Sequence, residues 1–255
     1  MDIKLSLIIP IFNVETFILD TLTRLTEWEQ GINFPVQIIL VNDGSVDSTK
    51  SIVENYINSQ NSSIEILSYK LNQGKGYAVK TGMLAAIGNF RIFTDADIPF
   101  GFEVINTFLY YLDFKEFDVV IGDRTLPDSR YNTDIPKIRK IGSYIFSFIV
   151  GRFVASGHFD TQCGMKGFKA EIATDLFSVS KINGFAFDVE LLYISLKRNY
   201  DIKRLPVVLR SQKGSSVNVL RHGFGMFIDL SVIKLNQLRG QYLKQKGIYR
   251  FNNNF

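Results

Sequence analysis

Residues 91–97 read Arg-Ile-Phe-Thr-Asp-Ala-Asp, an apolar, strand-like run that ends in two carboxylates. Side chains at i and i+2 of an extended chain point to the same face, so Asp95 and Asp97 can converge on one hard cation. Two carboxylates favour Mg²⁺ or Mn²⁺, which would bridge the two phosphates of a nucleotide donor and neutralise charge on the leaving diphosphate. Many surface loops contain such a triplet, and its position after a strand is what favours the metal-binding interpretation.

Similar strand-like runs recur on both sides of this segment, with amphipathic stretches of helical periodicity between them. The runs span residues 4–10, 37–42, 64–69, 91–95 and 118–122. Their alternation with helical stretches predicts an α/β fold with a doubly wound, mostly parallel sheet. Sheets of this kind bind ligands at the carboxyl ends of their strands, where Asp43 and the Asp95-Ala96-Asp97 triplet are expected.

The second half of the chain is less regular. We expect helices over 138–155 and 188–198, a strand over 204–209 and an irregular segment over 160–169. Residues 221–246 have the pattern of a mixed apolar and basic helix, with breaks at Gly223, Gly225 and Gly240. The predicted organisation is one domain over 1–220, with a nucleotide-binding half (1–97) and an acceptor-binding half (98–220), and then a basic amphipathic helical tail (221–255).

Composition limits the class of protein. With 255 residues, 46% of them hydrophobic, the chain can bury one sizeable core. Its formal net charge of +4 is concentrated in residues 221–255, which hold six Lys or Arg against one acid, Asp229. Such a tail favours a local anionic partner such as phospholipid over nucleic acid, for which the sequence has no recognisable module. The only cysteine, Cys163, excludes an internal disulfide framework and fits a reducing compartment.

The sequence has no secretory signal pattern and no uncharged apolar run of the ~18 to 20 residues needed to span a bilayer. We therefore expect a cytoplasmic protein in peripheral contact with the cytoplasmic face of a membrane. Residues 141–150 are strongly apolar and follow Lys137, Arg139 and Lys140. They form either a buried core helix or an interfacial helix, and in the second case they and the tail would provide a groove for an isoprenoid chain.

Two further segments follow predicted strands. Residues 43–45, Asp-Gly-Ser, precede Asp-Ser-Thr at 47–49, which predicts a tight turn and a helix start; Asp43 can also hydrogen-bond a base or a ribose. Residues 72–78, Asn-Gln-Gly-Lys-Gly-Tyr-Ala, form a glycine-bearing loop that opens a helix, where backbone amides and Lys75 can meet phosphate. This loop is not a P-loop, because the Gly-Lys-Ser/Thr ending is absent.

Four motifs together resemble those of the family 2 inverting glycosyltransferases, which have the GT-A fold. The motifs are Pro10-Ile11-Phe12-Asn13-Val14-Glu15, Val41-Asn42-Asp43-Gly44-Ser45, Asn72-Gln73-Gly74-Lys75-Gly76 and Asp95-Ala96-Asp97. Two more segments, residues 160–166 and 185–192, are most similar to the branch of dolichyl-phosphate β-glucosyltransferases and other polyprenyl-phosphate transferases. The resemblance covers nearly the whole chain.

This resemblance implies a role for each matching residue. The nucleotide pocket would be formed by Pro10, Phe12, Asn13, Glu15, Asp43, Gly74, Lys75 and Ala96. Asp95 would lie near the donor sugar and Asp97 on the metal. Related dolichyl-phosphate mannose synthases have a further metal-binding glutamine where this chain has Pro99, so another residue or water must complete the coordination. Arg124 and Arg210 occupy the places of two phosphate-binding arginines.

A phosphate acceptor is consistent with these residues. A sugar hydroxyl needs a general base near neutral pH, whereas a phosphate monoester is already anionic and can attack once cations orient it. Arg124 and Arg210 suit bidentate phosphate recognition. Asp160 is either such a base or, as we favour, an electrostatic and positioning group, and Gln162 is expected to hydrogen-bond the sugar or the acceptor.

The leading hypothesis is an inverting transferase that moves a hexose, glucose from UDP-glucose, to a polyprenyl or dolichyl phosphate with Mg²⁺ or Mn²⁺. The alternatives are a GT-A transferase with a soluble glycan acceptor and a noncatalytic nucleotide-sugar-binding module docked to a membrane complex. A nucleotidyltransferase is disfavoured, because its glycine- and arginine-rich N-terminal phosphate loop is missing. Asp188 and Glu190 are either part of the site or helix-start acids that complement the helix dipole.

Overall fold

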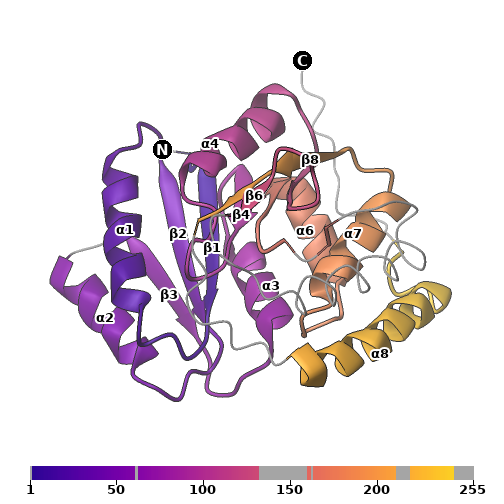
Figure 1. The fold of residues 1–255 in the computed structure, drawn as a ribbon, viewed down its shortest axis with the longest axis horizontal. Helices are drawn as coiled ribbons and strands as arrows, with labels where there is room; N and C mark the ends of the chain where they lie inside the picture. Colours follow the sequence, from indigo (N-terminus) through magenta and orange to yellow (C-terminus); the bar gives the residue numbers. More distant parts are fainter. Residues whose placement is uncertain (1, 61–62, 132–159, 162, 211–218, 244–255) are drawn as a thin grey trace.

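The structure, a computed structural model, describes residues 2–60, 63–131, 160–161, 163–210 and 219–243, and its centre is a seven-stranded sheet (Figure 1). The strands lie in the order β3-β2-β1-β4-β7-β5-β8. Their bounds are β1 (Leu5–Ile11), β2 (Val36–Asn42), β3 (Ile64–Ser68), β4 (Phe90–Phe93), β5 (Val119–Asp123), β7 (Lys166–Lys169) and β8 (Ile202–Pro206). Neighbouring strands are parallel except at β7, which runs antiparallel to both β4 and β5. The predicted mostly parallel α/β sheet is confirmed.

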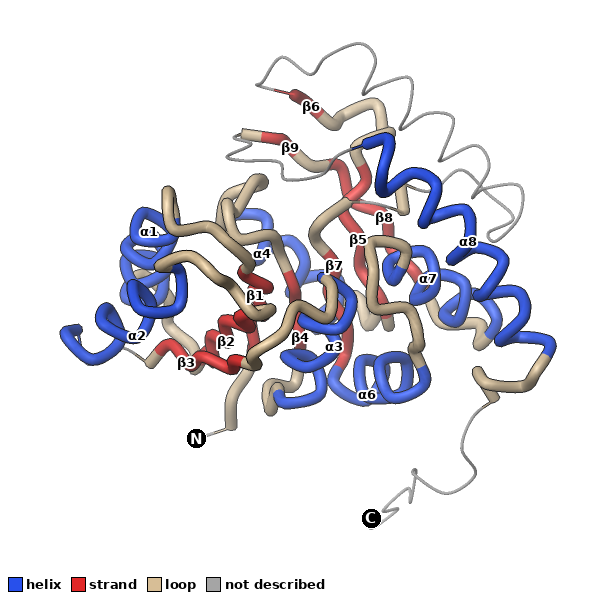
Figure 2. Tube along the Cα trace, turned by 90° about the horizontal axis from the view of Figure 1, so that it is seen from below, coloured by secondary structure: helices blue, strands red, loops and turns tan. Residues whose placement is uncertain are grey.

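Helices cover both faces of this sheet. One face carries α1 (Ile18–Gln30), α2 (Thr49–Gln60) and α4 (Glu103–Leu109), and the other carries α3 (Lys75–Ala85), α6 (Ala170–Val179) and α7 (Phe187–Lys197). In Figure 2, α1 and α4 lie on one side of the band of strands, and α3 and α6 lie on the other. The last helix, α8 (Val219–Leu238), packs on α7, with Leu230 and Ile233 buried in the same core.

Strand β1 shows why the layers form. Its odd-numbered apolar residues, such as Leu7 and Ile9, belong to the buried cluster with Leu22 of α1, whereas Ile8 belongs to the cluster with Met83 of α3. All five side chains are fully buried. A strand covered on both faces needs apolar side chains at consecutive positions, and such a run predicts this strand from the sequence alone.

The expected strands over the first half agree with β1 to β5 apart from small shifts at their ends. The irregular segment predicted over 160–169 is wrong in part, because residues 166–169 form β7 in the middle of the sheet. Its sequence, Lys-Gly-Phe-Lys, is short and half cationic, so it carries no strand pattern. The strand expected over 204–209 is divided between β8 and β9 (Val208–Leu209), and β9 pairs with β6 (Arg130–Tyr131) in a separate two-stranded sheet.

The C-terminal region also differs from expectation. Helix α8 continues through Gly223 and Gly225, which therefore do not break it, whereas Gly240, with φ of 71°, follows its end. The predicted boundary after residue 220 falls inside α8, and the division of the domain into two halves stays a prediction. The helix predicted over 138–155 lies outside the described residues. Within the described residues, no helix has the length and apolar content that crossing a membrane requires.

Candidate active site

The predicted site residues gather at the carboxyl edge of the parallel strands. Residues 12–15 follow β1, 43–45 follow β2 and 94–97 follow β4. The chain proceeds from β1 to β2 and β3 on one side, and then crosses to β4 on the other. The site therefore lies beside the topological switch point, where sheets of this class bind ligands.

The antiparallel strand β7 adds a late segment of the chain to this edge. Because β7 runs against β4, its first residue, Lys166, pairs with the last residue of β4, Phe93. The preceding turn brings Gly164 against the first carboxylate of the triplet, so closely that a Cβ atom at Gly164 would lie 1.9 Å from Asp95 Oδ2. The motif over 160–166 does not by itself indicate this contact between Gly164 and Asp95.

Asp95 is held by Lys75, the first residue of α3. The Lys75 ammonium donates a hydrogen bond to Asp95 Oδ1 in a partly buried ion pair. Burial lowers the pKa of Lys75, but the negative charges of Asp95, Asp188 and Asp97 outweigh it and leave that pKa raised. A protonated lysine at neutral pH therefore faces the carboxylates, at the loop where the sequence predicts a contact with phosphate.

The Asp95-Ala96-Asp97 triplet fits a metal site that is shared with the substrate. Asp97 is buried, and Thr21 Oγ1 donates a buried hydrogen bond to Ala96 O at 2.8 Å, which ties the triplet to α1. Within the described ranges, no three His, Cys, Asp or Glu side chains gather into a group that could hold a metal ion. Magnesium is commonly bound by one or two carboxylates, with substrate phosphates and water as the other ligands. Two oxygen-donor side chains at this edge match that pattern.

Asp43 holds the glycine-bearing loop in place. Its buried carboxylate accepts hydrogen bonds from Gln73 N at 2.7 Å, from Gly74 N at 3.0 Å and from Asn72 Nδ2 at 2.8 Å. Gly74 has φ of 102°, and a Cβ atom there would lie 2.5 Å from Asn183 O, so the loop requires glycine. Two segments that the sequence suggested as separate ligand sites thus form one unit, in which two loop amides already bind a protein carboxylate.

The loop after β1 is tied to the loop after β2. Asn13 Oδ1 accepts a hydrogen bond from Val46 N at 2.9 Å, and Glu15 Oε2 accepts one from Ser48 N at 2.8 Å. Asn13 adopts a positive φ of 51°, which turns the chain sharply after the strand. Pro10 is partly exposed and Phe12 is exposed, so they present an apolar surface at this edge. The part that these residues play in nucleotide binding stays a prediction.

Arg124 and Asp160 form a bidentate ion pair. Asp160 Oδ2 accepts from Arg124 Nε at 2.6 Å and from Arg124 N at 3.0 Å, and Oδ1 accepts from Nη2 at 2.8 Å. Burial raises the pKa of Asp160, but the hydrogen bonds and charge of Arg124 outweigh it and hold that pKa below 3.8. An ionised carboxylate with three donors is a weak base, so the geometry supports the positioning role for Asp160.

Arg210 lies in a different environment. Its Nη1 donates to Glu103 Oε1 at 2.9 Å, and its backbone N donates to Pro99 O at 2.8 Å. It borders a hollow of about 520 Å³ whose wall includes the stacked rings of Trp28 and Phe102. The structure thus connects Arg210 to the segment that follows Asp97, and its role as a phosphate ligand stays a prediction.

Asp188 and Glu190 lie in the first turn of α7, where acids complement the helix dipole, and both are buried. Glu190 Oε2 accepts from Ile182 N at 2.9 Å and Oε1 from Tyr242 Oη at 2.6 Å, so it joins α7 to the C-terminal region. Asp188 Oδ1 accepts from Lys166 Nζ at 2.6 Å. Lys166 ends the motif over 160–166, but the sequence pattern indicates neither its burial nor its contact with Asp188. Gln162 and residues 141–150 lie outside the described part of the chain.

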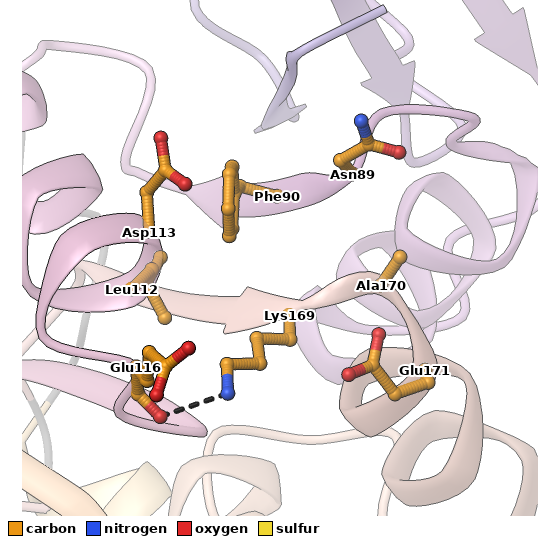
Figure 3. A pocket seen from close by; sticks show the side chains of 8 residues that line it. All are labelled: Asn89, Phe90, Leu112, Asp113, Glu116, Lys169, Ala170 and Glu171. Atoms are coloured by element: carbon orange, nitrogen blue, oxygen red, sulfur yellow. Dashed lines mark hydrogen bonds between the residues drawn. The ribbon is translucent and has the colours of Figure 1, made fainter. Parts of the chain in front are cut away.

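A second hollow, of about 360 Å³, lies at the opposite edge of the sheet (Figure 3). Its wall includes Asn89 and Phe90 at the amino end of β4, whereas Asp95 and Asp97 follow the carboxyl end of that strand. Lys169 Nζ donates across this hollow to Glu116 O at 2.8 Å. This hollow is therefore separate from the candidate active site.

Comparisons with known proteins agree with this arrangement. Residues 6–177 match the family model described as glycosyl transferase family 2. The chain is 33% identical over 249 residues to dolichyl-phosphate beta-glucosyltransferase of Dictyostelium discoideum, an alignment that covers 94% of this chain and 76% of the relative. It is 28% identical over 250 residues to the Homo sapiens protein of the same name, covering 94% and 77%.

The fold is similar to that of glucosyl-3-phosphoglycerate synthase from Mycobacterium tuberculosis in complex with Mn²⁺, uridine-diphosphate-glucose and glycerol 3-phosphate. The TM-score is 0.65 at 15% identity, with 92% of this chain and 79% of that chain covered. The family model spans both the carboxylate triplet and β7, and the Dictyostelium relative aligns along almost the whole chain. This protein therefore belongs to glycosyl transferase family 2.

Proposed function

We propose that this protein transfers a glucosyl residue from UDP-glucose to a polyprenyl phosphate of the dolichyl type, with inversion at the anomeric carbon. The observation that carries the proposal is the similarity to dolichyl-phosphate beta-glucosyltransferases, which aligns over 94% of the chain at up to 33% identity. The carboxyl edge of the sheet supplies the charged groups that such a reaction needs, in the Lys75–Asp95 and Arg124–Asp160 pairs.

On the donor side, the chain's own residues bind and orient the diphosphate. A divalent ion, Mg²⁺ or Mn²⁺, held by Asp97 and Asp95 would neutralise charge on the leaving group. Lys75 begins α3, so its ammonium and the positive end of the helix dipole both favour an anion at this position. Asp43 keeps the loop before Lys75 in place through its three hydrogen bonds.

On the acceptor side, a phosphate monoester attacks without losing a proton to the protein. The Arg124–Asp160 pair fits this chemistry, because Asp160 is ionised and hydrogen-bonded and its role is to orient a cation. Direct displacement of the diphosphate by a phosphate oxygen inverts the anomeric centre. No covalent intermediate on the protein is then required.

A lipid-linked acceptor requires contact with a membrane, and we assign this contact to α8 at the cytoplasmic face. Ile228, Leu235 and Leu238 are exposed on this helix, at 52%, 43% and 85%. Their spacing of seven and then three residues places them on one side of the helix, near the basic residues Lys234 and Arg239. Apolar side chains next to lysine and arginine favour the surface of an anionic bilayer.

A donor and acceptor panel tests the proposal. Purified protein is incubated with UDP-glucose, other UDP-sugars or GDP-sugars, a polyprenyl phosphate or a soluble glycan, and Mg²⁺ or Mn²⁺. We expect glucosyl lipid only from UDP-glucose, with loss of product on chelation and in Asp97→Ala. The control is Asp113→Ala, which removes an exposed acid paired with Lys4 and should leave the rate unchanged. Preference for a GDP-sugar, or product on the soluble glycan alone, would overturn the donor or the acceptor assignment.

A further inference from the structure

Lys166, the first residue of β7, is a fully buried lysine beside the candidate active site. Its ammonium donates to Asp188 Oδ1 at 2.6 Å, to Cys163 O at 2.8 Å and to Thr161 O at 3.1 Å. An ammonium group has three protons, and each has an acceptor here. All three protons of the Lys166 ammonium are therefore hydrogen-bonded within the protein, and its charge acts on the residues around it.

The two hydrogen bonds to carbonyl groups fix Thr161 and Cys163, which come shortly before β7. Asp160 stands directly before Thr161 and holds Arg124 through two side-chain hydrogen bonds. Gly164 stands directly after Cys163 and lies against Asp95, where even a Cβ atom would clash with Oδ2 at 1.9 Å. The position of Gly164 therefore limits the space for the Asp95 carboxylate, and the position of Asp160 sets the place of Arg124.

Stability alone does not account for a charge at this position. A buried ion pair costs desolvation of both ions, and an apolar pair of similar size is often as stable or more stable. Neighbouring positions of the sheet, such as Phe93 and Phe168, hold apolar side chains. Burial raises the pKa of Asp188 even though Lys166 and Lys75 lower it, which agrees with a strongly desolvated pair.

We propose that Lys166 is a positioning residue, which through Asp188 and the carbonyl groups of Thr161 and Cys163 holds Gly164 at the distance from Asp95 that glucosyl transfer needs. This inference rests on the proposed function for its activity readout. If Lys166 were merely structural, a Lys166 variant with restored stability would regain activity. A positioning role predicts instead that such a variant stays folded and slow.

The main test is the double variant Lys166→Met/Asp188→Leu, which removes both buried charges together. We expect it to fold with a lower melting temperature than the wild type, because the Thr161 and Cys163 carbonyl groups lose their donor although no unpaired charge remains. Its kcat should fall about 100-fold, the effect of a displacement of about 1 Å in an active site. Lys169→Met is the matched control, since Lys169 ends the same strand and bonds Glu116 O at the opposite edge of the sheet; its kcat should be unchanged. A stable double variant with wild-type kcat would overturn the inference.

A second variant, Gly164→Ala, tests the same geometry without touching a buried charge. The added methyl group displaces the Asp95 carboxylate, so we expect a folded protein whose kcat falls about 100-fold. The Mn²⁺-dependent gain in UDP affinity, measured by calorimetry, should fall about 10-fold, while UDP binding without metal stays as in the wild type. Unchanged kcat and unchanged metal dependence in Gly164→Ala would contradict the inference. If the wild type transfers no glucose to any polyprenyl phosphate, the proposed function fails, and the calorimetric comparison still decides whether this segment positions Asp95.

Discussion

Asp43, at the end of β2, binds the backbone amide of Gly74, at the entrance to α3, with 3.0 Å between Oδ2 and N. Asp43 thus supplies the carboxylate that binds the amides of the loop that presents Lys75. Because the residues at this edge of the sheet position one another, substitutions among them should change binding and stability separately.

Gly74→Ala should destabilise the protein, because its φ of 102° is unfavourable for alanine and the new Cβ atom would lie 2.5 Å from Asn183 O. We expect a loss of at least about 1 to 3 kcal/mol in the free energy of unfolding. Gly225→Ala is the control, since Gly225 lies in α8 with nothing within 4 Å of a Cβ atom. There we expect a gain of about 0.5 to 1 kcal/mol. Urea unfolding of both variants measures the two signs, and equal effects would contradict the loop geometry.

Lys75→Met should make the nucleotide-free protein bind Mn²⁺ more tightly, because Asp95 then loses its competing cation. Removal of one charge-assisted hydrogen bond predicts a gain of about tenfold in affinity. The same variant should bind UDP more weakly, because the phosphate loses a cation. Mn²⁺ titration followed by electron paramagnetic resonance measures the first effect and calorimetry the second. Lys80→Met is the control: this lysine is on the same helix and donates to Ser180 O at 2.7 Å, so neither affinity should change.

Asp160→Asn should remove a pH-dependent part of the stability. The folded-state pKa of Asp160 is lowered below 3.8, so its ionised form stabilises the fold above that pH, and this contribution is lost as the pH falls through the folded value. We expect the variant to be less stable by about 1.5 to 3 kcal/mol at pH 7, with the difference shrinking below pH 3.8. Urea unfolding between pH 7 and pH 3 measures this difference, and a gap that does not change with pH would contradict the assignment.

Leu238→Glu should weaken binding to anionic lipid vesicles, because it places a negative charge on the exposed apolar side of α8. A fall of about tenfold in the partition coefficient is expected from the loss of one buried leucine and the added repulsion. Leu19→Glu, at an exposed leucine of α1, is the control and should partition as the wild type does. Sedimentation with phosphatidylglycerol vesicles measures both, and equal partition of the two variants would argue against α8 as the contact.

Sequence pattern predicted the strands that are buried on both faces, since β1 and β2 consist mostly of apolar residues. It also predicted the carboxylates that follow them, because a polar residue at the end of such a run is conspicuous. It did not predict β7, whose first residue, Lys166, is a cation buried only because Asp188 and two carbonyl groups surround it. It also left the Asp43 loop contact unseen, because that contact joins loops about 30 residues apart and depends on the packing of the sheet.

The antiparallel insertion of β7 has a consequence for the order in which the protein folds. Strands β1 to β4 can pair as soon as they have been synthesised, but in the described part of the chain they are joined to β5 and β8 only through the four residues of β7. The centre of the sheet therefore closes only when β7 pairs with both β4 and β5, through long-range contacts of the kind that slow folding. In pulsed hydrogen exchange during refolding, the amides of β1 and β2 should gain protection before those of β7. Until β7 docks, an emerging chain exposes the edge of β4 to other chains.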